Sequence, residues 1–306
     1  MLASLVIIIV IVVMVVKWRP ISFAVMNYIS EPYNKAFYEK NFVVEHGVIY
    51  RIDDDGGRYQ VIRDFSESFE NVNTIRDLIS IERGWTTFTI LSPKAPNVQD
   101  YNNLRDLILL GESDFLDNRI EPSSEQAHSG LQSLKASAVA PGPGMCCTKA
   151  SLSTQLLHFG NGDNVWFSSW YYIEEPEEYI TLLDLESTFV RGYPGMRIRL
   201  QKGYLEFELA KWVPNEIYRQ AEGEEISFPI GRWVLVEAHL LLSEKDDGII
   251  QLFQDHTLII DRRGQTLPFR DAVYDSLEVG LSAHSSGSES AVLYLDDLNI
   301  SAGLIH

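Results

Sequence analysis

The feature that most limits the fold of this chain is a series of short β-forming runs between residue 113 and the C-terminus. Runs such as "VWFSSWYYI" and "GMRIRLQ" alternate with turn sequences such as "NGDN" and "KDDG", and no long amphipathic helical pattern interrupts them. Many short strands at even spacing are typical of an antiparallel sandwich or a barrel. We therefore predict a mainly β fold, with a two-sheet antiparallel β-sandwich of the jelly-roll type over residues 112–306.

The N-terminal segment predicts a membrane anchor. Residues 2–16, "LASLVIIIVIVVMVV", carry no charge, and with "KWRPISFAVM" they reach the roughly 20 residues that a spanning helix needs. A cleaved signal peptide is the alternative, but no basic segment precedes the run and no clear cleavage motif follows it. We expect a single uncleaved transmembrane helix over residues 1–26, with Trp18 at the membrane interface.

Two opposing arguments bear on the orientation of this anchor in the membrane. Lys17 and Arg19 follow the apolar run, and the positive-inside rule would keep the rest of the chain in the cytoplasm. Large domains, however, translocate despite so weak a bias. We expect the bulk of the chain to be extracytoplasmic.

Residues 27–111 differ from the residues after 113 in their pattern of strand-forming and helix-forming runs. The turn sequence "DDDGG" lies between two β-forming runs and predicts a hairpin, and "NVNTIRDLISIERG" predicts a short helix that ends at Gly84. We predict a small α+β region or an N-terminal elaboration of the sandwich, and we find no functional motif in it.

Charge and cysteine content exclude some classes of function. The formal net charge of −18 disfavours nucleic acid as a partner, because phosphates require a basic surface. The only two cysteines, Cys146 and Cys147, are adjacent, so the chain has no disulfide framework. A bond between neighbours would close a strained ring, and we expect two free or buried thiols.

Alternation within the runs separates an inward face from an outward face. Val165, Phe167 and Tyr171 predict a core face for one run, and similar apolar sets occur in the later runs. The opposite faces carry aromatic and charged side chains, which can stack on apolar sugar faces and bind sugar hydroxyls or carboxylates. Burial beneath the N-terminal region, or an ordinary solvated sheet face, is the alternative. The candidate ligand-binding residues are Trp166, Trp170, Tyr172, Arg197, Glu237 and His284.

The order of motifs resembles the heparin-lyase-like polysaccharide lyases within the concanavalin A-like lectin and glucanase superfamily. The segments that carry the resemblance are "HSGLQSL", "VWFSSWYYIEEP", the long run from "PIGRW" to "RRGQT", and the closing "AVLYLDDLNIS". It covers roughly the last two thirds of the chain. It supports the fold more than an activity, since such folds host lectins, hydrolases and lyases alike.

For a lyase that cleaves a uronic-acid polymer, the resemblance implies three roles on the concave sheet. Arg199 or Arg197 would neutralise the substrate carboxylate, His239 would be the base and Tyr204 the acid. The alternative for His239 is a partly exposed strand residue with no task. Glu206 and Glu237 on the predicted face would oppose a polyanionic substrate.

The resemblance also raises a structural calcium site, since related jelly rolls often tie the closing strand to the opening one with Ca²⁺. Asp296 or Asp297, with Asp117 and carbonyls near Gly130, would supply hard oxygen ligands. A solvated acidic pair at a strand end is the alternative. No other cofactor is expected.

Three functions follow from these observations. The first is a membrane-anchored, extracytoplasmic protein that binds a polysaccharide or another glycan. The second is a polysaccharide lyase that acts by β-elimination. The third is a non-catalytic domain whose sheet face binds another protein. The composition of the strand faces separates the first two functions from the third only weakly.

Overall fold

The computed structural model describes residues 35–303, except residues 37, 54, 176–178, 189–194, 211–214 and 286–288. The predicted anchor over residues 1–26 lies outside the described residues. Within the described part, no helix is long and apolar enough to cross a membrane.

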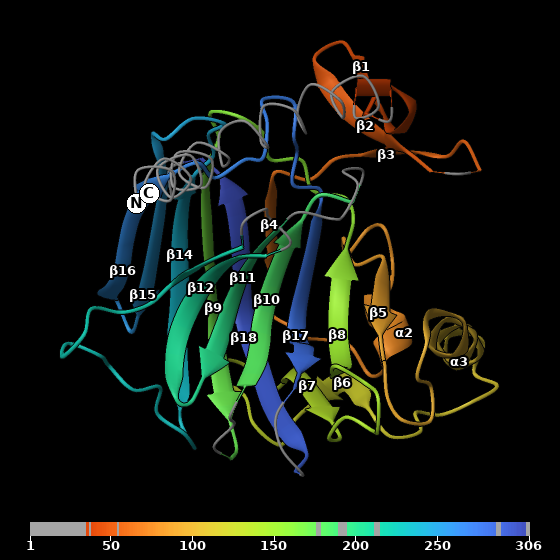
Figure 1. Cartoon of the computed structure of the whole chain (residues 1–306). Helices are drawn as coiled ribbons and strands as arrows, with labels where there is room; N and C mark the ends of the chain where they lie inside the picture. Colours follow the sequence, from red (N-terminus) through yellow and green to blue (C-terminus); the bar gives the residue numbers. More distant parts are fainter. Residues whose placement is uncertain are drawn as a thin grey trace, which may run out of the picture.

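Two antiparallel sheets pack face to face and form the body of the molecule (Figure 1). One sheet has seven strands in the order β13 (Glu216–Tyr218), β12 (Tyr204–Ala210), β11 (Gly195–Gln201), β10 (Tyr179–Glu186), β17 (Ser276–His284), β8 (Thr148–Thr154) and β5 (Thr87–Thr89). The other has eight strands on the path β16 (Thr257–Gly264), β15 (Gly248–Gln254), β14 (Trp233–Leu241), β9 (Asn164–Ile173), β18 (Ala291–Ala302), β7 (Ser133–Ala138) and β6 (Arg119–Ser123), with β4 (Asp64–Glu67) pairing β18.

The core lies between the sheets and is built from the inward faces that alternation predicts. In β9, Val165, Phe167 and Tyr171 are buried in the core cluster, while the residues between them are partly exposed or polar. The apolar faces of β11, β12, β14 and β17 belong to the same cluster. The predicted two-sheet antiparallel β-sandwich is therefore confirmed.

The region before residue 112 contributes strands to both sheets. The strand β5 pairs with β8 at one edge, and β4 pairs with the later half of β18. The helix α2 (Ile75–Leu78) and the fully buried Trp85 belong to the same core. The sandwich thus includes part of the segment that the sequence assigned to an α+β region or elaboration.

The helix α3 (Val98–Leu110) lies beside β5 at one side of the sandwich (Figure 1). Asn97 caps its N-terminus by accepting a hydrogen bond from the Asp100 backbone N–H at 3.1 Å. Gly111 ends the helix in the left-handed conformation, at φ 78°. Leu104 and Ile108 pack into the core and hold the helix against the sandwich.

A small three-stranded sheet lies at one end of the sandwich (Figure 1) and consists of β1 (Phe42–Glu45), β2 (Val48–Ile52) and β3 (Arg58–Gln60). Contacts of Arg51 and Phe42 in the sheet, and of Tyr38 just before it, hold it there. Arg51 of β2 forms an ion pair with the buried Asp275, and the Tyr38 hydroxyl lies 2.8 Å from Nε2 of His158. The ring of Phe42 also meets the His158 imidazole edge-on at 5.4 Å.

His158 should make stability depend on pH. Burial lowers its pKa from about 6.5 to about 4, so the unfolded chain takes up a proton that the folded one does not. Stability is then fully present above about pH 6.5 and is lost as the pH falls towards 4, by about 2–3 kcal/mol for this group.

We expect His158→Gln, which cannot be protonated, to have a flatter dependence of unfolding free energy on pH between these limits. Denaturant titrations at a series of pH values measure it. An equal dependence of unfolding free energy on pH in the wild type and in His158→Gln would contradict the attribution of this effect to His158.

Candidate functional site

The outer face of the seven-stranded sheet carries a row of charged residues across adjacent strands. Ser153 of β8 pairs with Glu278 of β17, which pairs with Asp184 of β10. Asp184 in turn pairs with Arg197 of β11, which pairs with Glu208 of β12. These side chains point away from the core because their sequence neighbours point into it.

The cations of this face are ion-paired. Arg197 Nε lies 2.5 Å from Asp184, and Lys149 Nζ lies 3.0 Å from Glu278. Burial alone would lower the pKa of Lys149, but the charges of Glu278 and Asp184 outweigh it and raise the pKa. The ammonium therefore stays charged at neutral pH.

Arg199 is the most enclosed of these cations. Its guanidinium contacts Glu206 at 2.7 Å and Glu208 at 3.1 Å, and it lies over the ring of Tyr179 at 5.3 Å. Its side chain is only 7% exposed. The Arg199 guanidinium therefore forms ion pairs with carboxylates of its own sheet.

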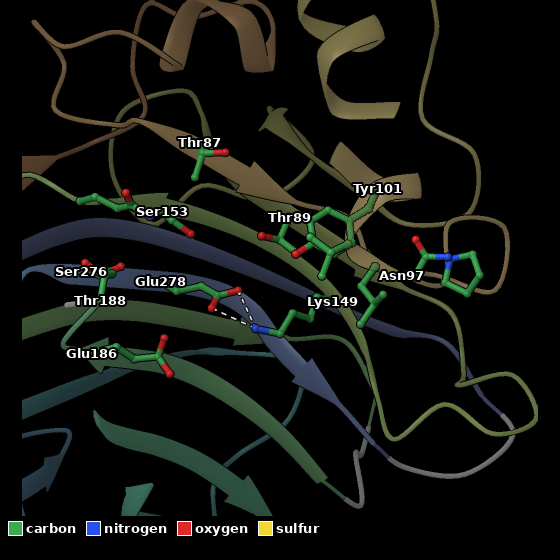
Figure 2. Close-up of a pocket in the computed structure, with 14 residues that line it drawn as sticks. Thr87, Thr89, Asn97, Tyr101, Lys149, Ser153, Glu186, Thr188, Ser276 and Glu278 are labelled. Carbon is green, nitrogen blue, oxygen red and sulfur yellow. Dashed lines mark hydrogen bonds and ion pairs between the residues drawn. The ribbon is translucent and has the colours of Figure 1, made fainter. Parts of the chain in front are cut away.

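A pocket of about 510 Å³ opens on this face between β5, β8, β10, β17 and the start of α3. In Figure 2 the Lys149–Glu278 ion pair is drawn between the ring of Tyr101 and the carboxylate of Glu186. The lining residues with hydroxyl, amide or charged groups are Thr87, Thr89, Asn97, Tyr101, Lys149, Ser153, Gln155, Glu186, Thr188, Ser276 and Glu278, while apolar atoms, including those of Leu91, Pro96 and Val98, make up the larger part of the lining surface. It offers several hydrogen-bonding groups and one aromatic ring to a polar ligand.

The candidate residues from the sequence lie on two opposite faces of the molecule. Arg197, Arg199 and Tyr204 belong to β11 and β12 of the seven-stranded sheet. Trp166, Trp170, Tyr172, Glu237 and His239 belong to β9 and β14 of the eight-stranded sheet, where His239 pairs with Trp166.

The structure therefore does not bring His239 together with Arg199 and Tyr204. Both sets point away from the core, as predicted, but from different sheets, so the whole sandwich separates them. The concave-sheet arrangement that the resemblance implied for these three residues is not formed. The reason is that alternation identifies an outward side chain but not the sheet to which its strand belongs.

The aromatic residues of the eight-stranded sheet stack on histidines. The Trp166 ring lies 4.1 Å from that of His239, and the Trp170 ring lies 3.8 Å from that of His128, both nearly parallel. His239 also contacts Gln251 at 2.9 Å and Asn164 at 3.1 Å.

The side chains beside these stacked rings also contact other side chains of this chain. Tyr172 packs against Trp233 with ring centroids 5.7 Å apart, and Glu237 pairs with His256 at 3.0 Å. The aromatic groups on the outward face of β9 are thus already packed against side chains of this chain.

One other candidate, His284, occupies an unexpected position, whereas Tyr204 is exposed as its outward direction predicts. His284 is fully buried, with Nδ1 at 3.4 Å from the Thr148 hydroxyl and 3.3 Å from the Val139 carbonyl, so it does not line an open surface. Tyr204, at the edge of the charged face, is exposed.

The predicted calcium ligands do not come together. Asp296 accepts hydrogen bonds from the backbone N–H groups of His128 at 2.9 Å and Ser129 at 3.1 Å, and Asp297 contacts the side chains of the same two residues. Asp117 pairs with Lys94 at 2.6 Å. No cluster of three or more potential metal ligands occurs among the described residues. The acidic pair instead holds the 128–129 turn against the closing strand, because its oxygens already accept hydrogen bonds from N–H and O–H donors.

Sequence patterns missed most of the pocket. Thr87, Thr89, Asn97 and Tyr101 come from the region in which no motif was found, and they reach the pocket because β5 joins the edge of the sheet. Glu278 is an outward residue of a predicted run, whereas Lys149 lies on β8, a strand for which no run was predicted, and nothing local indicates that the two residues meet.

Comparison with known proteins supports the fold. No protein-family model and no curated protein matches the chain. Among solved structures, the chain is similar to an endo-β-1,4-glucuronan lyase from the fungus Trichoderma reesei, with TM-score 0.55 and 11% identity over 79% of this chain and 96% of that one. It is also similar to the cellulose induced protein Cip1, with TM-score 0.52 and 16% identity over 78% of this chain and 97% of that one. The resemblance to the concanavalin-like jelly-roll fold of polysaccharide lyases is confirmed, and at this identity the likeness shows the fold alone.

Proposed function

We propose that this protein binds a glycan in the pocket on the outer face of the seven-stranded sheet and does not cleave it. The observation that carries the proposal is the lining of the pocket, which combines hydroxyl, amide and carboxylate groups with the ring of Tyr101 and other apolar surface. Such a combination can bind a sugar, because polar groups hydrogen-bond its hydroxyls and an apolar ring face packs against its C–H groups. The fold shared with a glucuronan lyase is consistent with a glycan at this sheet.

The ion pairs of the face argue against β-elimination. A lyase needs a cation that is available for the uronate carboxylate, together with a base and an acid. Here Lys149, Arg197 and Arg199 are each matched by carboxylates of the same face, and His239 lies on the other sheet. Glu186 in the pocket lining, which adds a carboxylate beside the Lys149–Glu278 pair, would also repel a uronate. We infer that the ligand is a neutral or amino-sugar glycan.

The membrane anchor over residues 1–26, with the sandwich outside the cytoplasm, remains part of this proposal. Its support is the uncharged apolar run in the sequence. Such an anchor would hold the glycan-binding pocket at a cell surface.

Loss of the Tyr101 ring should weaken glycan binding. We expect Tyr101→Leu, which keeps apolar volume, to reduce affinity about fivefold, because a stacked ring contributes roughly 1 kcal/mol. Thr89→Val, which removes only the hydroxyl, should have an effect of similar size if that group binds the sugar. Calorimetric titration with neutral, amino-sugar and uronate oligosaccharides measures both.

The control for these variants is Trp170→Phe, on the outer face of the opposite sheet, which should bind glycans as the wild type does. Loss of binding in Trp170→Phe but not in Tyr101→Leu would instead place the glycan site on the outer face of the eight-stranded sheet. A rise in ultraviolet absorbance with any uronate polymer, from the unsaturated product of β-elimination, would overturn the proposal in favour of a lyase.

A further inference from the structure

Cys146 and Cys147 bring their sulfur atoms together in the segment between β7 and β8. The two Sγ atoms lie 3.5 Å apart, with Cys146 exposed and Cys147 partly buried. In an extended chain, neighbouring side chains point in opposite directions. The chain therefore departs from extended geometry here and places the two thiols in contact.

We propose that Cys146 and Cys147 form a reversible redox pair, which closes to a vicinal disulfide by exchange with a low-molecular-weight disulfide. The Cα atoms of adjacent residues are only about 3.8 Å apart, below the separation of roughly 4.4–6.8 Å usual in disulfides. A bond between them is therefore strained and readily reduced. This property suits a switch rather than a structural crosslink.

The exchange has two steps. The Cys146 thiol loses its proton, and the thiolate attacks one sulfur of the small disulfide, forming a mixed disulfide and releasing one small thiol. Cys147 then loses its proton and attacks Sγ of Cys146, which releases the second small thiol and closes the ring. Two electrons pass from the protein dithiol to the small disulfide, and the two protein protons leave on the two small thiols.

The different solvent exposures of the two thiols explain why Cys146 reacts first and Cys147 second. Cys146 is open to solvent and can meet an external disulfide. Burial raises the pKa of the Cys147 thiol to about 11, and the neighbouring Cys146 adds to the effect. Cys147 is therefore a poor nucleophile towards reagents in solution, but the contact with Cys146 makes its attack intramolecular.

Hydrogen bonds on both sides of the two cysteines confine the conformational change on disulfide closure to a short segment. On one side, a turn is closed by the Met145 N–H to the Gly142 carbonyl at 3.0 Å, with Gly144 at φ 80°. On the other, the Thr148 hydroxyl donates to the Val139 carbonyl at 2.6 Å, and the Lys149 N–H donates to the Leu91 carbonyl at 2.9 Å. The fold should survive closure, and the inference does not depend on the glycan site.

The test uses the full chain, reduced, freed of reductant and then incubated with oxidised glutathione. We expect a product lighter by two hydrogens, with both thiols lost and no glutathione attached, and dithiothreitol should restore both thiols. Ring closure should accelerate about tenfold per pH unit from about pH 7 to about pH 9, because the Cys147 thiolate is scarce in this range.

Single variants serve as matched controls. Cys147→Ser should stop at a stable glutathione adduct on Cys146, and Cys146→Ser should react more slowly than Cys147→Ser. A persistent glutathione adduct on the wild type, linked dimers or two unreacted thiols would each overturn the proposal. Faster reaction of Cys146→Ser than of Cys147→Ser would overturn the assigned order of attack.

Discussion

Replacing Arg199 by methionine is expected to lower the free energy of unfolding by about 3–5 kcal/mol, the usual cost of removing one partner from a buried ion pair. The variant leaves Glu206 and Glu208 buried beside each other without their shared guanidinium. Methionine fills much of the volume of the arginine stem, so the loss would report charge rather than packing. Urea denaturation monitored by tryptophan fluorescence measures the difference.

Arg219 provides the matched control for Arg199. It binds the same carboxylate, Glu206, at 2.7 Å, but its side chain is 61% exposed. An exposed ion pair contributes about 0–1 kcal/mol, so Arg219→Met should be nearly neutral. Similar losses in the two variants would show that burial does not set the strength of this cluster.

Replacing Asp275 by alanine is expected to cost a similar amount, about 3–5 kcal/mol. Its carboxylate is fully buried, pairs with Arg51 and accepts a hydrogen bond from the Thr188 backbone N–H at 2.7 Å. Burial raises the pKa of Asp275, although Arg51 and Thr188 oppose the shift. Removing this carboxylate leaves the Thr188 N–H without this acceptor and the largely buried Arg51 guanidinium without its counter-charge, although Arg51 still donates to the Gln155 carbonyl at 2.8 Å.

The loss in Asp275→Ala should be concentrated in the sheet of β1, β2 and β3, because Arg51 lies on β2. Limited proteolysis should cut this sheet earlier in Asp275→Ala than in the wild type. The control is Arg58→Met in the same sheet, which breaks the solvent-exposed pair with Glu45 and should be nearly neutral. Unchanged proteolysis in Asp275→Ala would contradict a role of this ion pair in holding the sheet.

Sequence patterns predicted the sandwich better than the site. The turn sequences and the period-two alternation of runs such as 233–241 correctly indicated strands and their inward faces, since Val234, Val236 and Ala238 are in the core. Both properties are local, because each depends on a few successive residues and on the pleat of a strand. The motif order, read over a longer stretch, also indicated the right family of folds.

The candidate site depended on contacts between distant segments. Trp166 and Arg199 are outward residues of similar runs, yet they lie on opposite sides of the sandwich. Tyr101 had no local sign of function and reaches the pocket only because α3 packs beside β5. His284 faced outward by simple alternation, but the irregular register between β17 and β8 accompanies its burial.

By itself, the sequence determined that residues after 113 form short antiparallel strands, which side chains of most strands enter the core, and that the charge disfavours nucleic acid. Only the tertiary structure decided which sheet each strand joins, which cations meet which carboxylates, and where a pocket opens. The physical reason is that side-chain alternation is a property of one strand, whereas strand order comes from pairing between segments far apart in the chain. Lys149 and Glu278 are 129 residues apart and become an ion pair in the pocket only because β8 and β17 are neighbours.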